Sequence, residues 1–235
     1  AGMKVLHVVA NPRHARKAGG AGVDAVITSG TEGGGHSGMD LLTTFILVPL
    51  VADAAKIPVI AGGGVGDGRG FAAALTLGAE AVYMGTRFIA TKECPVHQNW
   101  KQVFIQSEGT DTAVIRHGRP SIEETKDVQT EIRLGSVRFL LNEYARGLLR
   151  VGTEGKSPEE AMKYYLSPPP GYEDKEVSRS LVSAVYGDIV QGGVAAGQVV
   201  GLIQDIPTCR ELMGRVIADA EKILLRLSGK KTEPR

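Results

Sequence analysis

The chain has 235 residues, above the usual size of one domain and short of two comfortable ones. A composition of 43% hydrophobic and 23% charged residues excludes a disordered chain and a coiled coil. The 27 basic and 26 acidic side chains leave a formal charge of +1, so no overall basic field suggests nucleic acid as a partner.

The cysteines and the apolar runs bear on the cellular compartment. Cys94 and Cys209 are far apart and lack a CxxC partner, so we expect neither a disulfide framework nor a zinc site. The most apolar run, residues 41–55, is too short to span a bilayer. The N-terminus lacks the layout of a signal peptide. We therefore expect a soluble, cytoplasmic protein with no membrane partner.

The first ninety residues alternate between two kinds of segment. Short apolar runs rich in β-branched residues predict strands at 4–9, 25–28, 58–61 and 81–84. The stretches between them predict helices at 12–21, 49–55 and 71–77. Near-continuous apolar strands that alternate with helices favour an α/β fold with a parallel sheet covered on both faces.

Beyond about residue 95 the pattern changes to helical spacing. It is visible in Val137, Leu140, Leu141, Tyr144 and Leu148. Pro207 precedes a last amphipathic helix that carries Leu212, Val216, Ala220, Ile223 and Leu227 on one face. We therefore predict a mainly helical region at 95–227 and a flexible polar tail at 228–235.

The glycines are unevenly distributed. The chain has 31, and eleven of them fall in two nine-residue windows, 30–38 and 62–70. Each window follows a predicted parallel strand, where α/β folds bind ligands. Bare backbone N–H groups there, together with the N-terminal end of the next helix, suit a phosphate. The alternative is that the glycines only permit tight turns.

His36 is the most informative single residue. It is the only ionisable side chain among residues 33–38, and glycines flank it. An imidazole in that position can exchange a proton near neutral pH. The alternative is a surface histidine in a loop. His7, in contrast, falls within a predicted strand and is expected in the core.

Three further polar residues leave two interpretations open. Glu32 either orients His36 or caps a loop. Arg87, near the expected phosphate site, is either an anion ligand or a surface cation. Gln198 is an isolated amide in an apolar segment and needs hydrogen-bond partners if it is buried.

The two glycine segments, residues 22–38 and 58–70, with 73–79 and 84–88, resemble the flavin-dependent nitronate monooxygenase family. Its relatives include the flavin enoyl-acyl-carrier-protein reductases, and residues 196–203 resemble the family's C-terminal segment. The resemblance implies a TIM-type (β/α)₈ barrel that holds FMN, with His36 as the catalytic base. It also implies flavin contacts at Ser29, Gly34, Gly63, Gly64, Tyr83, Met84, Gly85 and Thr86. Many family members carry glutamine where this chain has Ser29.

Family members have about four more βα units before the segment that corresponds to residues 4–9. The resemblance therefore assigns residues 1–94 to the C-terminal half of an FMN-binding barrel. Four open strands cannot close a barrel. Three explanations remain: a truncated product, a missing half supplied by a second chain, or a homo-oligomer of self-paired half-barrels.

Three functions follow as hypotheses. The first is oxidation of alkyl nitronates or nitroalkanes with O₂, a small-molecule reaction in which His36 removes the proton α to the nitro group. The second keeps the site and uses NAD(P)H to reduce an enoyl-acyl-carrier-protein. The third is a non-catalytic half-barrel that binds a phosphate ligand or assembles with a partner.

Overall fold

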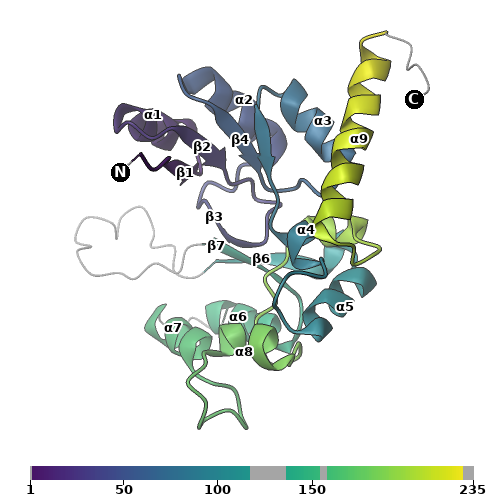
Figure 1. Ribbon diagram of the computed structural model, residues 1–235. Helices are drawn as coiled ribbons and strands as arrows, with labels where there is room; N and C mark the ends of the chain where they lie inside the picture. The colour runs from purple at the N-terminus through teal and green to yellow at the C-terminus, as the bar shows by residue number, and fades with distance from the viewer. Residues whose placement is uncertain (1, 117–135, 154–157, 230–235) are drawn as a thin grey trace.

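The computed structural model describes residues 2–116, 136–153 and 158–229. These residues form a parallel sheet and a separate antiparallel sheet, surrounded by helices (Figure 1). The parallel sheet has the strand order β1–β2–β4–β5, with β1 (Leu6–Val9), β2 (Ala25–Thr28), β4 (Val59–Gly62) and β5 (Ala81–Tyr83). The four strands predicted from the sequence, their parallel pairing and the α/β class are therefore confirmed.

Three helices pack against the parallel sheet, namely α1 (Pro12–Gly20), α2 (Thr44–Ala54) and α3 (Gly68–Thr76). Val9, Val26 and Val59 from the strands meet Leu47 and Val51 of α2 in one buried cluster. Burial of these apolar side chains is what holds the layers together, because each buried aliphatic side chain contributes about 1.5–3 kcal/mol.

The start of α2 differs from the prediction. The sequence suggested a helix at 49–55 with Pro49 near its first turn, but α2 begins at Thr44 and Pro49 lies inside it. The side chain of Thr43, at the N-cap position, accepts no hydrogen bond from the backbone N–H groups of the helix. The carboxylate of Glu32, twelve residues earlier, caps the helix instead, so no local signal marked its start.

The antiparallel sheet has the order β3–β7–β6, with β3 (Gly35–Ser37), β6 (Thr112–Arg116) and β7 (Ser136–Leu140). The predicted helical run across 137–148 is wrong in its first part, because Val137 and Leu140 belong to β7. Tyr144 and Leu148 do lie on a helix, α6 (Glu143–Thr153). Since β3 comes from the first ninety residues and β7 from the later region, the two regions share a sheet. The domain boundary at residue 94 stays a prediction.

The remaining helices are α4 (Thr86–Ile89), α5 (Gln98–Gln106), α7 (Pro158–Leu166), α8 (Arg179–Tyr186) and α9 (Cys209–Leu227), with 3₁₀ turns at Gly109–Asp111 and Gln198–Leu202. Helices α6, α7 and α8 lie together on the far side of the antiparallel sheet, and α9 runs alongside α3 (Figure 1). Gly68 permits that contact, since a Cβ there would lie 2.8 Å from the carbonyl oxygen of Val216. The predicted last helix is confirmed, whereas residues 230–235 of the predicted tail lie outside the described residues.

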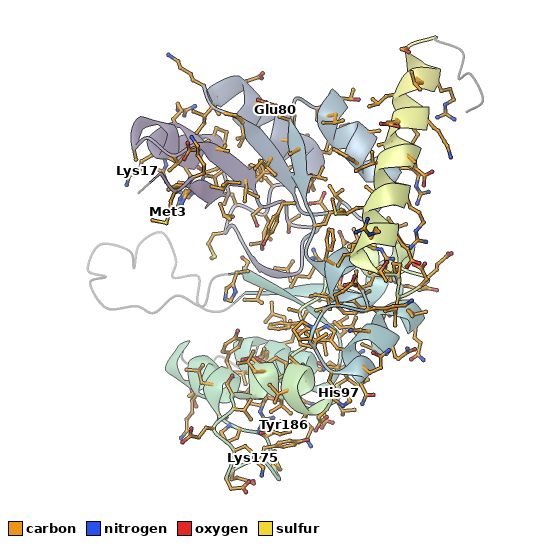
Figure 2. All side chains as sticks on the ribbon, viewed as in Figure 1. Met3, Lys17, Glu80, His97, Lys175 and Tyr186 are labelled. Carbon is orange, nitrogen blue, oxygen red and sulfur yellow. The ribbon has the colours of Figure 1, made fainter. Side chains whose placement is uncertain are left out.

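The two edge strands of the parallel sheet expose apolar side chains. On β1, Leu6 and Val8 are about half exposed, and on β5 Tyr83 is 58% exposed. Met3, beside the N-terminal end of β1 in Figure 2, is 81% exposed. His7, expected in the core, is also exposed because β1 has a neighbour on one side only. Within the described residues, no helix is both long and apolar enough to cross a bilayer.

Candidate functional site

A cavity of about 270 Å³ lies at the carboxyl ends of the four parallel strands. Its walls come from β1, β2, β4 and β5, from the two glycine windows, and from Val199 in the 3₁₀ turn Gln198–Leu202. The structure brings all the sequence-predicted site residues to this one cavity: Ser29, Gly34, His36, Gly63, Gly64, Tyr83, Met84, Gly85 and Thr86. Their individual roles stay predictions.

Gly63 lets the two glycine windows touch. Its φ is +94°, a conformation that L side chains rarely adopt. A Cβ atom there would lie 2.7 Å from the carbonyl oxygen and 2.8 Å from the amide nitrogen of Gly30. The amide of Gly30 also donates to the carbonyl oxygen of Gly62, at 2.9 Å. The glycine content of the windows is thus partly explained by close packing of one loop on the other.

Free backbone N–H groups line one side of the cavity. Within the part of the chain that the structure describes, the N–H groups of Gly64, Gly85 and Thr86 donate no hydrogen bond. A Cβ atom on Gly85 would meet no atom within 4 Å, so the space on the side-chain side of Gly85 is open. Exposed backbone donors beside open space are what an anionic group requires.

The N-terminal end of α3 does not add to these free N–H groups, contrary to the expectation from the second glycine window. Asp67 caps it, because its Oδ1 accepts the amides of Arg69 at 2.9 Å and Gly70 at 3.2 Å. Burial alone would raise the pKa of Asp67, but hydrogen bonds from Arg69 and Gly70 lower it below its ordinary value. Two N-terminal donors of α3, the N–H groups of Arg69 and Gly70, are therefore already taken by a carboxylate.

His36 lies in the middle of β3 and its side chain is exposed at the cavity. The β3 backbone pairs with β7, which places His36 opposite Val137. Gly34, two residues before His36, packs directly on another segment, because a Cβ atom there would lie 2.6 Å from the backbone of Ala196 and Gly197. The histidine therefore lies on a paired strand, and not in the surface loop of the alternative interpretation.

Glu32 caps the start of helix α2, and among the described residues its side chain makes no hydrogen bond to His36. Both carboxylate oxygens accept the backbone N–H of Thr44, each at 2.9 Å, and Oε2 accepts its hydroxyl at 3.0 Å. The carbonyl oxygen of Glu32 accepts the amide of Gln198 at 2.9 Å. The side chain of Gln198 is exposed, so the question of a buried amide does not arise.

Arg87 matches neither of its two interpretations. Its side chain is only 5% exposed and donates to Asp205 Oδ1 at 2.8 Å. Arg215 of α9 donates to the other oxygen of Asp205, also at 2.8 Å. Burial lowers the pKa of Arg87, and the charge of Asp205 offsets part of that effect. Arg87 is thus linked to α9 through Asp205 and Arg215, and it lies away from the cavity that holds the predicted site residues.

Two residues that the sequence did not single out support the histidine segment. The hydroxyl of Thr44 donates to the carbonyl oxygen of Gly63 at 2.9 Å. Arg138 is buried on β7, and its Nε donates to the carbonyl oxygen of Thr31 at 2.8 Å. Burial lowers the pKa of Arg138, while the nearby Glu32 carboxylate offsets part of this shift. Arg138 is 107 residues from its partner, so no local pattern pointed to it.

The fold and the cavity define an α/β protein with a ligand site at the carboxyl ends of parallel strands, the position that enzymes of this class use. The sequence profile described as nitronate monooxygenase matches residues 1–219. The chain therefore belongs to the nitronate monooxygenase family, whose members are oxidoreductases.

Similar proteins carry several names. Over 94% of its length the chain is 36% identical to the (3aS,4S,5R,7aS)-5-hydroxy-7a-methyl-1-oxo-octahydro-1H-indene-4-carboxyl-CoA dehydrogenase of Rhodococcus jostii. Over 97% it is 30% identical to the nitronate monooxygenase of Paraburkholderia phytofirmans. The structure of FabK from Thermotoga maritima covers 97% of the chain with 35% identity and a TM-score of 0.79. The chain spans 66%, 57% and 64% of the lengths of these three proteins, respectively.

Proposed function

We propose that the four parallel strands are the C-terminal half of a (β/α)₈ barrel. Strands β1 and β5 both end the sheet, and Leu6 and Val8 of β1 and Tyr83 of β5 expose apolar surface that a barrel would cover. The remaining strands come from a further segment, from a second chain or from a second copy of this chain. The similar proteins are about one and a half times as long as this chain. Their additional length supports the proposal that further strands complete the barrel.

We propose that the cavity binds FMN. The free N–H groups of Gly64, Gly85 and Thr86, and the open space before Gly85, fit a phosphate group. Ser29, Gly34, Gly63, Tyr83 and Met84 would line the remainder of the cofactor's site. The cavity of about 270 Å³ is slightly below the usual range for ligand pockets, about 300–1,000 Å³, as expected for walls that half a barrel supplies.

We propose that the reaction is the oxidation of nitroalkanes or alkyl nitronates with O₂. The observation that carries this proposal is a single imidazole, His36, on a fixed strand at the rim of the cofactor cavity. His36 removes the acidic proton from the carbon next to the nitro group. A bound flavin would supply the electron-accepting chemistry. The glycine loops hold and orient the cofactor.

A second candidate is oxidation or NAD(P)H-dependent reduction of an acyl thioester, including an enoyl-acyl-carrier-protein. The observation in its favour is the 36% identity with a protein named as the dehydrogenase of a carboxyl-CoA. The same histidine suits this chemistry, because the carbon next to a thioester carbonyl also exchanges a proton.

Two assays on the purified protein separate these candidates. We expect oxygen uptake with a preformed alkyl nitronate, with no requirement for NADH. NADH oxidation that depends on a crotonyl thioester, without oxygen uptake on the nitronate, would instead assign the second reaction. A colourless protein that is active in neither assay would support the non-catalytic half-barrel.

A further inference from the structure

The segment that carries His36 is connected to the Gly63–Gly64 loop through two side chains. Glu32, four residues before His36, accepts the backbone N–H and the hydroxyl of Thr44. The same hydroxyl lies 2.9 Å from the carbonyl oxygen of Gly63. Thr44 therefore stands between a carboxylate on the histidine segment and a carbonyl on the second glycine loop.

The contacts differ in what they hold. The backbone N–H of Thr44 and the carboxylate of Glu32 together cap the start of α2, a role that any acceptor at this place fulfils. The hydroxyl adds a connection that the cap does not need. A hydroxyl has one proton, so it donates to Glu32 or to Gly63 at any moment, and the two acceptors hold it between them. We call these contacts of Glu32, Thr44 and Gly63 the junction.

The junction has little room to adjust. A Cβ atom on Gly30 would overlap the Thr44 hydroxyl, and a Cβ atom on Gly64 would lie only 3.2 Å from Cβ of Glu32. The backbone of Glu32 is held independently by the amide of Gln198. A displacement of the Gly63–Gly64 loop would therefore press on Glu32, which lies three residues before the start of β3.

We propose that Glu32 and Thr44 are positioning residues, which fix the His36 segment relative to the glycine loop at which the proposed cofactor binds. This inference rests on the proposed function for its catalytic consequence. The coupling of the two loops, however, is a property of the polypeptide itself and is measurable without any cofactor or substrate.

The test separates the junction from the helix cap. Thr44→Val removes the hydroxyl and keeps the backbone N–H that Glu32 caps, whereas Thr44→Ser keeps both. ¹⁵N relaxation gives backbone order parameters, which are about 0.85 for rigid segments and below about 0.6 for flexible ones. We expect values for residues 34–37 and 63–65 to fall together in Thr44→Val and to be restored in Thr44→Ser.

Glu211 provides a matched control, because its Oε2 accepts both the backbone N–H and the hydroxyl of Thr208 at the start of α9. Glu32→Gln should loosen both loops, and Glu211→Gln should leave them unchanged. If Thr44→Val changes neither loop, or only one, the proposed coupling is wrong. The same holds if Glu32→Gln alters only residues 44–47, since Glu32 would then be a helix cap and nothing more.

Activity gives a second readout that distinguishes this inference from the proposed function. Thr44→Val should lower turnover of a neutral nitroalkane about tenfold more than turnover of its preformed nitronate, because only the former needs an accurately placed base. Equal losses on both substrates in Thr44→Val, with a clear difference between them in a His36 variant, would remove the positioning role alone. No difference in the His36 variant either would remove the proposed function.

Discussion

Replacing His36 with asparagine is expected to lower turnover of a neutral nitroalkane by roughly 10²–10⁴-fold, the usual contribution of a positioned general base. Turnover of the preformed nitronate should change little, because that anion has already lost its proton. Asparagine is close to histidine in size and β3 is held by its backbone pairing with β7. The variant should therefore fold and keep its cavity.

Steady-state rates with the two ionisation states of one substrate test this expectation. His14→Asn is a suitable control, since His14 is exposed on α1 and is not among the residues that line the cavity. It should behave as the unmodified protein does with both substrates. Equal rates for His36→Asn and the unmodified protein on the neutral nitroalkane would remove His36 as the base.

Replacing Gly63 with alanine is expected to cause the second large effect, a loss of about 2–6 kcal/mol in the free energy of unfolding. A positive φ at a non-glycine residue costs about 1–3 kcal/mol, and forcing extra atoms into a packed region costs about 1–3 kcal/mol more. Both costs apply here, because φ is +94° and the new Cβ would press on the backbone of Gly30. The carbonyl oxygen and the amide nitrogen of Gly30 are backbone atoms, so they cannot move aside as the end of a flexible side chain can.

Urea unfolding of Gly63→Ala and of the unmodified protein measures this difference in stability. Gly214→Ala on α9 is the matched control, because a Cβ there meets no atom within 4 Å. Alanine favours a helix interior by up to about 1 kcal/mol, so this control should be slightly more stable than the unmodified protein. An unfolding midpoint for Gly63→Ala at or above that of the unmodified protein would show that the two glycine loops do not pack as described.

The parallel sheet was predictable because its signals are local. Residues such as Val26, Ile27 and Val59 form short β-branched runs, and the pattern alone indicates buried strands. The cap of α3 was readable in the same way, since an aspartate directly before the helix is a strong N-cap signal. The expectation of a free helix end there overlooked Asp67.

The antiparallel sheet was not predictable from local pattern. Gly35–Ser37 has low strand propensity, and its partner strand lies about a hundred residues later. The periodic apolar residues from Val137 to Leu148 cross from β7 into α6, so one spacing pattern covered two different elements. Tertiary pairing decided the structure of this region.

The residues that line the candidate site were predicted from the sequence, but the residues that hold these segments in place were not. Resemblance to a family brought nine residues together, and the structure places all nine around one cavity. Thr44 and Arg138, which hold the histidine segment, escaped notice because each acts through backbone carbonyls of residues far away in the sequence. Nothing in the identity of a threonine or an arginine indicates such a contact.

Titration of the purified protein with FMN and with riboflavin, followed by flavin fluorescence, tests most directly whether the strand ends form a flavin phosphate site. Hydrogen bonds to a charged group contribute about 1.5–3 kcal/mol, so FMN should bind at least about tenfold more tightly than riboflavin. Gly85→Val, which places a branched side chain in the open space beside Gly85, should abolish most of that preference. Equal affinity for the two flavins, or no binding of either, would contradict the account.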